Sequence, residues 1–262
     1  MPRGTALVTG ASGGIGLELA RVLARDGYDL MLAARSGDKL TAAAEALAKE
    51  YGVRAVTATV DLARADGTDR MMEALADAGL SIDVLVNNAG FATFGLFTEI
   101  ALANELEELQ LNVVTLTSLT KRLLPAMLAK GEGRILNVAS TAAFVPGPYM
   151  AVYYATKAYV LSFSAALAEE LRDTGVTVTC LCPGPTASDF QARARMEASP
   201  VSRRPMPSAK SVAEYAVDAM ERGVTVAIPG FDNRAIPWAA RLLPRGLLTR
   251  IVRRIQAPRK GS

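Results

Sequence analysis

The sequence predicts an α/β protein built on one doubly wound sheet, with about seven parallel strands and helices on both faces. Short apolar runs alternate with longer segments of helical periodicity, a pattern typical of right-handed strand–helix–strand units. The apolar runs are continuous, as expected of strands that are buried on both faces. Neither a linker nor a repeat nor a low-complexity tract divides the 262 residues. We therefore expect a single domain over residues 1–262.

The elements follow one another in a regular order along the chain. Helical spacing is clear in Ile15, Leu19 and Leu23 after the first apolar run, and again around Leu109 and Val113, because these residues recur every three or four positions. The runs predicted as strands are short, apolar and rich in β-branched residues. They are residues 5–9, 28–34, 54–60, 83–88, 134–140, 176–182 and 224–229.

The chain contains no histidine, and this excludes several classes of enzyme. Ser-His-Asp hydrolysis, His-assisted cysteine chemistry and His-based zinc sites all require an imidazole. The two cysteines, Cys180 and Cys182, are too few for an all-thiolate zinc site or a disulfide framework. We expect no metal, and two buried thiols in a reducing compartment. Proton transfer near neutral pH then requires a carboxylate, or a Tyr, Lys or Cys with a displaced pKa.

The N-terminal residues do not have the pattern of a signal peptide, because their apolar stretch is short and a glycine-rich turn follows. Uncharged apolar runs all fall well short of the roughly 20 residues that span a membrane. The net charge of +3 is modest. We expect a cytoplasmic protein.

A glycine-rich turn, residues 9–16, joins the first predicted strand to the first predicted helix. Glycines let a chain turn tightly and let backbone N–H groups approach a phosphate at a helix N-terminus. The spacing differs from the common dinucleotide fingerprint, and no Gly-Lys-Ser/Thr follows, which excludes a Walker-type triphosphate loop. The alternative is a purely structural turn. The residues predicted to bind a cofactor here are Gly10, Ser12, Gly13, Gly14, Ile15 and Gly16.

The end of the second predicted strand indicates which dinucleotide binds. NAD-binding proteins place an acidic residue there for the ribose 2′-OH, whereas this chain has Ala33, Ala34 and then Arg35. An arginine pairs with a 2′-phosphate through charge-assisted hydrogen bonds. We therefore favour NADP(H) as the cofactor, the alternative being a solvated arginine at a strand end.

Several positions with useful chemistry are predicted at or just beyond the carboxyl ends of strands. Ligands bind at that edge in open α/β sheets, and packing alone does not explain why such residues gather there. The positions are Gly10, Arg35, Asp61, Asn87, Ser140 and Pro183.

Five short motifs also occur together and in a familiar order. They are residues 9–16, Asn87-Asn88-Ala89-Gly90, Asn112, Ser140, and Tyr153 with Lys157 four residues later. With these motifs the chain resembles the short-chain dehydrogenase/reductase family over roughly residues 4–230, and most closely the bacterial NADP-dependent reductases of unassigned substrate. It is similar, more distantly, to hydroxysteroid and 3-oxoacyl reductases. The resemblance implies a Rossmann-type fold.

The resemblance also implies cofactor contacts. Asp61, followed by Leu62, resembles the family acid that contacts the adenine, although a turn aspartate is the alternative. The stretch from Pro183 and Gly184 to Thr186 resembles the motif beside the nicotinamide amide, the alternative being a plain turn. The remaining residues expected to contact the cofactor are Asn87, Asn88, Ala89, Gly90, Tyr153 and Lys157.

Without histidine, Tyr153 is the natural general acid for hydride transfer to a carbonyl. An unperturbed phenol has a pKa of about 10, too high for efficient work at neutral pH, and Lys157 lies one helical turn away on the same side. Lys157 is therefore expected to lower the pKa of the phenol and, by the resemblance, to bind the nicotinamide ribose. Ser140, or Thr141 beside it, would hydrogen-bond the substrate oxygen, and by the resemblance Asn112 holds a water that links Lys157 to solvent. The competing interpretations are a packing tyrosine, a serine that ends a strand and a core amide.

These observations predict an NADP(H)-dependent oxidoreductase that interconverts a carbonyl and an alcohol on a lipophilic small molecule (EC 1.1.1.-). A catalytically silent NADP-binding sensor or scaffold is the alternative. The residues expected on the substrate side are apolar, which suits a lipophilic ketone or aldehyde. They are Phe91, Phe94, Leu96, Phe97, Ala142, Phe144, Val145, Tyr149 and Met150.

Two basic segments complete the chain. Residues 186–208 are predicted as a lid that faces solvent or accepts an acidic headgroup. Residues 236–262 form a basic amphipathic segment, which packs on the core or on another subunit or, as the less favoured alternative, lies on an anionic membrane surface. Nucleic acid is not expected as a partner. By the resemblance we expect a homodimer or homotetramer, formed through the helices that bear Asn112 and Tyr153.

Overall fold

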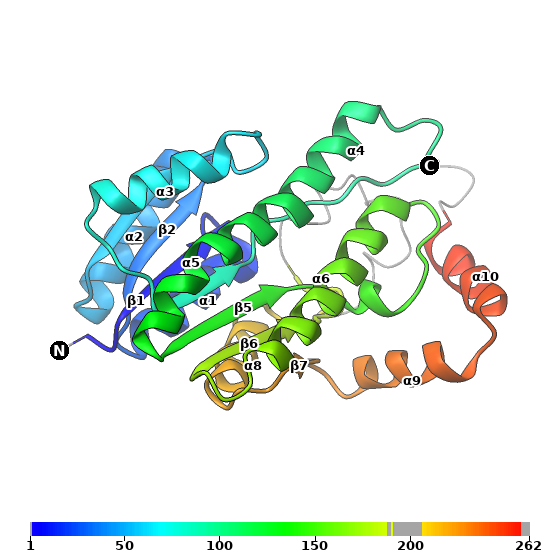
Figure 1. Cartoon of the computed structure of the whole chain (residues 1–262). Coiled ribbons are helices and arrows are strands. Elements are labelled where there is room, and N and C mark those ends of the chain that lie inside the picture. The colour runs from blue at the N-terminus through cyan, green and yellow to red at the C-terminus, as the bar shows by residue number, and fades with distance from the viewer. Residues whose placement is uncertain (1, 188–189, 191–205, 258–262) are drawn as a thin grey trace.

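The computed structural model describes residues 2–187, 190 and 206–257 (Figure 1). A parallel seven-stranded sheet runs through this part of the chain in the order β3-β2-β1-β4-β5-β6-β7, and the predicted fold class is confirmed. Each run predicted as a strand overlaps one of the seven, and β5 begins one residue before the predicted run. The strands are β1 (Thr5–Thr9), β2 (Asp29–Ala34), β3 (Ala55–Thr59), β4 (Val84–Asn87), β5 (Gly133–Val138), β6 (Val176–Leu181) and β7 (Val226–Ala227).

Successive residues of each strand lie on opposite faces of the sheet. Leu7 and Leu85 pack with helices on one face, and Val8 and Val86 pack with helices on the other. Each such side chain contributes about 1.5–3 kcal/mol of hydrophobic stabilisation, which explains why the strands are apolar throughout. The helices are α3 (Gly67–Asp77), α5 (Leu116–Lys130) and α6 (Ala151–Glu170) on the first face, and α1 (Gly14–Arg25), α2 (Gly37–Tyr51) and α8 (Ala209–Glu221) on the second.

The chain reverses its direction of winding between β1 and β4, which are neighbours in the sheet although two strands separate them in the sequence. At such a point the connections leave β1 and β4 toward opposite faces, and a crevice opens beyond the carboxyl ends of the strands. The predicted site residues follow these strand ends. The topology therefore gathers them at one edge of the sheet.

A continuous helical rod crosses this edge (Figure 1). Helix α4 (Leu102–Leu109) passes into the π-helical segment η1 (Gln110–Thr115) and then into α5 without a break. π-Helical turns inside α-helices are often found at functional sites, and here the turn contains Asn112. A short 3₁₀ turn, η2 (Thr141–Phe144), links β5 to α6.

The C-terminal helices α9 (Ala235–Leu242) and α10 (Arg245–Gln256) follow a 3₁₀ turn, η4 (Asp232–Arg234), and lie at the edge of the molecule beyond β7 (Figure 1). Leu248 and Gln256 of α10 are buried, and the Gln256 amide contacts the Tyr154 hydroxyl of α6. The neighbouring apolar stripe of Leu247, Ile251 and Ile255 is exposed. One face of the predicted amphipathic segment therefore packs on the body of the protein.

Two further predictions concern membranes and the lid. None of the helices in the described part of the chain is both long enough and apolar enough to cross a bilayer. Most of the basic lid predicted at residues 186–208, including its four arginines, lies outside the described residues.

Candidate active site

The turn between β1 and α1 packs directly on the end of β4. Gly10 has a φ of +68°, and a Cβ there would lie 2.8 Å from Asn88 Nδ2 and 3.0 Å from Ala89 Cα. A Cβ on Gly16 would lie 2.4 Å from the Gly10 carbonyl oxygen. Only glycine permits this approach. The motif at residues 9–16 and the motif at residues 87–90 thus form one interlocked structure.

The N-terminus of α1 is open. Gly13 is the N-cap residue, so no side chain caps the first turn, and a Cβ at Gly13 would meet nothing within 4 Å. The first N–H groups of a helix have no partner within the helix and carry its positive partial charge. Ser12, Gly14 and Ile15 belong to the same turn. This donor set and the space in front of it fit a pyrophosphate.

Arg35 and Asp61 follow the neighbouring strands β2 and β3. The Arg35 side chain is 61% exposed, and its Nη1 lies 3.7 Å from Oε1 of the half-exposed Glu107. Such a pair contributes at most about 1 kcal/mol, so the guanidinium is available to an anion. Oδ1 of Asp61 accepts a hydrogen bond from the Ala63 N–H at 3.1 Å, as a turn aspartate does. The carbonyl of Leu62 accepts a hydrogen bond from the Thr115 hydroxyl at 2.7 Å.

Asn87, expected beside the cofactor, lies inside a buried network of neutral polar side chains. Its Nδ2 donates to Thr120 Oγ1 at 3.0 Å and to Asn137 Oδ1 at 2.9 Å. Asn137 in turn donates to Ser164 Oγ at 2.9 Å. These bonds join β4, β5, α5 and α6. Thr120, Asn137 and Ser164 were not predicted from the sequence, although their polarity within apolar runs was the available signal.

Thr9, the first residue of the motif at residues 9–16, has a structural role that was not predicted from the sequence. Its hydroxyl donates to the Val86 carbonyl at 3.1 Å and accepts from the N–H groups of Asn88 and Ala89, both at 3.0 Å. Asn88 Nδ2 returns a bond to the Thr9 carbonyl at 2.9 Å. Thr9 therefore fixes Asn88 and Ala89 against β1, which explains a threonine directly before Gly10.

Tyr153 and Lys157 lie on one side of α6, and both are buried. Lys157 Nζ lies 5.7 Å from the centre of the Tyr153 ring and donates a hydrogen bond to the Val138 carbonyl at 2.8 Å. Burial lowers the pKa of Lys157 to about 8, because the ammonium loses solvation. The ammonium is thus anchored at the end of β5, beside the phenol.

Ser140 lies between the Tyr153–Lys157 pair and the turn that follows β6. Its Oγ accepts the Ala142 N–H at 3.1 Å and lies 3.4 Å from the Pro183 carbonyl. Burial raises the pKa of the Tyr153 phenol above its ordinary value of 10.0, and the Ser140 hydroxyl opposes this shift. The expectation of a lowered phenol pKa is therefore corrected, since burial outweighs the groups that favour the phenolate.

Asn112 faces the same corner from η1. Its Nδ2 donates to the Phe91 carbonyl at 2.9 Å and to Thr156 Oγ1 at 3.2 Å, and its Oδ1 accepts the Phe91 N–H at 3.2 Å. A Cβ on Gly90 would lie 2.9 Å from Asn112 Oδ1 and 3.5 Å from Lys157 Nζ. Asn112 and Lys157 thus converge on Gly90 without a direct bond between them.

An apolar cluster surrounds Tyr153. Ala142 and Met150 are buried against it, and Phe94 and Phe190 pack alongside, with the Phe190 and Tyr153 ring centres 5.6 Å apart. Of the other residues expected here, Leu96 is 50% and Phe97 is 64% exposed. The expected substrate side is therefore apolar near the phenol and opens to solvent at Leu96 and Phe97.

The turn after β6 faces the same corner. The Pro183 carbonyl accepts the Thr141 N–H at 2.9 Å, and Thr186 Oγ1 donates to the Gly184 carbonyl at 3.0 Å. A Cβ on Gly184 would lie 2.5 Å from Asn233 Oδ1. This turn is packed between η2 and η4, so its course past the site is fixed.

Comparison with known proteins identifies the family. A family model described as short chain dehydrogenase matches residues 4–199, which is more than half of the chain. The chain belongs to the short-chain dehydrogenase family. The match includes Gly10, Asn112, Ser140, Tyr153 and Lys157.

Curated members of the short-chain dehydrogenase family include relatives of similar length. A putative ketoacyl reductase of Streptomyces coelicolor is 38% identical over 192 residues, 72% of this chain and 73% of that protein. Ketoacyl reductase HetN of Nostoc is 32% identical, covering 86% of this chain and 77% of that protein. The very-long-chain 3-oxoacyl-CoA reductase of Rattus norvegicus is 37% identical, but the match covers only 58% of that enzyme.

Solved structures also resemble this chain over most or all of its length. One from Sphingobium yanoikuyae in complex with NADPH has a TM-score of 0.83 and 31% identity, covering 100% of this chain and 99% of that one. L-sorbose reductase from Gluconobacter frateurii, complexed with NADPH and L-sorbose, has a TM-score of 0.76 and 28% identity, covering 87% and 95%. The chain is therefore an oxidoreductase-family protein with a Rossmann-type fold.

Proposed function

We propose that the protein is an NADP(H)-dependent oxidoreductase that interconverts a carbonyl and an alcohol on a lipophilic small molecule. The proposal rests on one observation above all: a buried phenol, a buried ammonium and a serine hydroxyl converge in an apolar corner at the carboxyl edge of the sheet. Ionisable groups held together at such an edge are typical of catalytic sites.

NADP(H) is supported as the cofactor by the open N-terminus of α1 and by the exposed guanidinium of Arg35. The Sphingobium and Gluconobacter relatives are both complexes with NADPH. When bound, NADPH supplies the hydride. The first turn of α1 would hold the pyrophosphate, and Arg35 would hold the 2′-phosphate.

The catalytic role proposed for each residue follows from its protonation state or its hydrogen bonds. Tyr153 is a neutral phenol at neutral pH, since burial raises its pKa, and it therefore carries the proton that an alcohol product needs. The Ala142 N–H donates a hydrogen bond to Ser140 Oγ and so orients it. The Ser140 hydroxyl would donate a hydrogen bond that polarises the carbonyl of the substrate. Lys157 would then return a proton to Tyr153, because its pKa of about 8 allows it to give one up near neutral pH.

A lipophilic ketone is the substrate class that the surroundings of Tyr153 favour. Phe94, Met150 and Phe190 form an apolar wall, and burying a ligand there removes apolar surface from water. The names of the Streptomyces, Nostoc and rat relatives refer to ketoacyl and 3-oxoacyl substrates. Acyl ketones therefore come first in a substrate screen, followed by steroid-like ketones.

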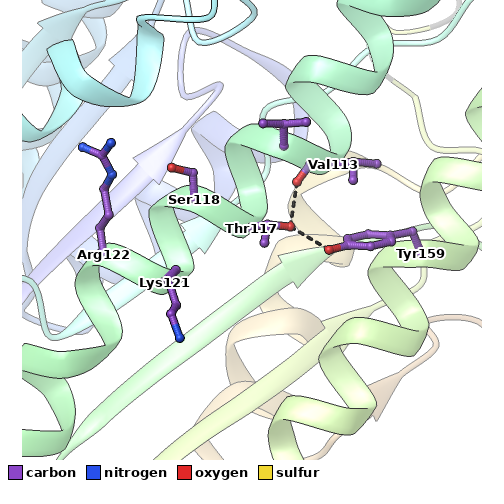
Figure 2. Close-up of a pocket in the computed structure, with 7 residues that line it drawn as sticks. Val113, Thr117, Ser118, Lys121, Arg122 and Tyr159 are labelled. Carbon is purple, nitrogen blue, oxygen red and sulfur yellow. Dashed lines mark hydrogen bonds between the residues drawn. The ribbon is translucent and has the colours of Figure 1, made fainter.

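Self-association is proposed through the outer face of η1, α5 and α6. An open groove of about 440 Å³ lies on this face. Figure 2 shows residues that line it, among them Thr117, whose hydroxyl donates to the Val113 carbonyl at 2.8 Å and lies 2.9 Å from the Tyr159 hydroxyl. Val114 and Tyr159 beside it are 50% and 38% exposed. An open face that combines these apolar side chains with the polar Ser118, Lys121 and Arg122 suits a second copy, and members of this family commonly form dimers or tetramers. The two free, buried cysteines support a cytoplasmic location.

The substitution Tyr153→Phe tests the proposal. It removes the proton donor and leaves the packing of the ring, so NADPH oxidation with a ketone should fall by about 10²–10⁴-fold while NADPH binding, measured by fluorescence titration, persists. Retained turnover would contradict the proposed mechanism. Tight NADPH binding without turnover of any ketone or alcohol by the unaltered protein would instead favour the sensor or scaffold.

A further inference from the structure

Helix α4 buries two carboxylates that the proposed mechanism does not use. Glu105 is 5% exposed and Glu108 is fully buried. Both point at Thr93, in the segment that follows Gly90. Oε2 of Glu108 accepts the Thr93 N–H at 2.9 Å and its hydroxyl at 2.8 Å, whereas Oε2 of Glu105 lies 3.4 Å from the hydroxyl. Glu108 makes the principal contact.

Glu108 lies one helical turn before Asn112, so the two side chains share a face of the rod. Asn112 holds both backbone groups of Phe91, and Glu108 holds Thr93 two residues later. Together they fix the segment that ends at Phe94, which packs beside Tyr153. The position of the substrate side therefore depends on both residues.

The second oxygen of Glu108 has a different environment. Oε1 is buried and has no hydrogen-bond partner among the described residues. A carboxylate in this position costs stability. Burial raises the pKa of Glu108 to about 7. The charge of Glu105 also raises this pKa, whereas the charge of Lys157 lowers it. Glu108 and Lys157 thus influence each other between α4 and α6.

The charges that face Lys157 come from each element packed around it. Burial disfavours the ammonium, whereas Cys180 on β6 and then Glu108 on α4 favour it. The Cys182 thiol just after β6 remains neutral, because its hydrogen bond with Cys180 and its burial raise its pKa. Tyr153 precedes Lys157 on α6. Both thiols are buried. Among the carboxylates in the described part of the chain, Glu108 is the one that acts on Lys157.

We propose that Glu108 is a positioning residue for the reaction, which fixes the Thr93 segment through one oxygen and stabilises the ammonium of Lys157 through its negative charge. This inference rests on the proposed function. It assigns the two roles to separable parts of one side chain, because the hydrogen bonds need an oxygen acceptor and the ammonium needs a charge.

Glu108→Gln separates these roles, since the amide oxygen still accepts from Thr93 but the charge is gone. The alkaline limb of the pH profile of kcat/KM should move to lower pH by about half a unit or more, because an opposite charge near a lysine raises its pKa. KM for the ketone should stay within about twofold. Glu105→Gln on the same helix is the matched control: it removes a charge that raises the pKa of Glu108, so it should not move the limb to lower pH.

Thr93→Val provides the complementary variant. It removes the hydroxyl but keeps the carboxyl group of Glu108 and its bond to the Thr93 N–H. Since the lost hydroxyl bond lowers the pKa of Glu108, we expect a raised KM for the ketone with a smaller shift of the alkaline limb than in Glu108→Gln. Glu108→Met removes both functions and should show both effects, provided that circular dichroism confirms a folded protein.

NMR titration of the lysine ¹³Cε signals gives a readout that does not require turnover. The pKa of Lys157 should be lower in Glu108→Gln than in the unaltered protein and in Glu105→Gln. An unchanged Lys157 titration in Glu108→Gln would overturn the inference, even if the protein reduces ketones. Absence of ketone reduction by the unaltered protein, with the Lys157 shift present, would contradict the proposed function instead.

Discussion

Two groups of buried polar side chains lie at the same edge of the sheet, a short distance apart in the fold, and they differ in kind. The first group, Asn87, Asn137 and Ser164 with their partners, is neutral, and each side chain has a hydrogen-bond partner. The second group, Tyr153, Lys157 and Glu108, is ionisable. Its pKa values are displaced by burial, and one oxygen of Glu108 has no partner among the described residues.

The difference separates a structural role from a chemical one. Satisfied neutral amides stabilise a fold and resist change. Burial in the same surroundings destabilises the charged form of an ionisable group. It brings the pKa values of Lys157 and Glu108 toward neutral pH, where such groups exchange protons readily. Burial of a polar group therefore does not indicate function by itself, whereas ionisable groups whose pKa values are displaced together at the edge of the sheet are candidates for a chemical role.

The largest expected effect follows from Lys157→Met. Loss of the ammonium should reduce kcat by about 10²–10⁴-fold without lowering Tm, since burial of the charged group opposes folding. Steady-state kinetics and thermal denaturation measure the two quantities. A variant that keeps its activity but loses stability would show that Lys157 has a structural role, like the neutral group of Asn87, Asn137 and Ser164.

The pH dependence of stability tests Glu108. Its pKa is about 7 in the folded protein against an ordinary 4.5, so the folded state holds a proton that the unfolded state releases. The free energy of unfolding should fall as the pH rises from about 4.5 to 7, by up to about 3 kcal/mol at ~1.4 kcal/mol per pKa unit. Urea denaturation at several pH values checks this, and Glu108→Gln should flatten the curve. An equal slope in both proteins would show that Glu108 is not responsible.

Asn137→Ala is the corresponding test of the neutral group. It removes one hydrogen-bond partner from Asn87 and one from Ser164, and should cost about 1–3 kcal/mol of unfolding free energy, with little change in kcat for the protein that remains folded. Denaturant curves and active-site titration give both values. A large loss of kcat at unchanged stability would contradict the distinction between the two groups.

The smallest effect is expected at the exposed Arg35. Arg35→Asp should raise KM for NADPH by about tenfold or more and change that for NADH little, with no effect on stability. Initial rates with the two cofactors provide the comparison. Equal losses with both would show that Arg35 does not recognise the 2′-phosphate.

The fold was predictable because parallel strands buried on both faces produce continuous apolar runs, and these runs were all found. Only β7 is much shorter than expected, at Val226–Ala227 within residues 224–229. It is an edge strand, as β3 is, but only two residue pairs join it to β6, so fewer bonds define its ends. The positions of Ser140, Tyr153 and Lys157 followed from strand ends and helical spacing, which are local properties.

The missed features depend on contacts between distant parts of the chain. Asn87 and Asn137 are 50 residues apart, and Glu108 lies 15 residues from Thr93. The pKa of Tyr153 was expected to fall because its lysine neighbour was visible in the sequence, whereas the extent of its burial was not. Local spacing predicts which groups meet, but the balance of burial and charge that sets their pKa values requires the whole fold.

The most direct test of the proposed chemistry is the transfer of deuterium from NADPH deuterated at C4 of the nicotinamide. The cofactor, in both stereochemical forms, is incubated with the protein and a panel of acyl and steroid-like ketones, and the products are examined by mass spectrometry. We expect one deuterium on the carbinol carbon of an alcohol product with one of the two forms, and none with Tyr153→Phe. Tight NADPH binding with no labelled alcohol from any ketone would contradict the account.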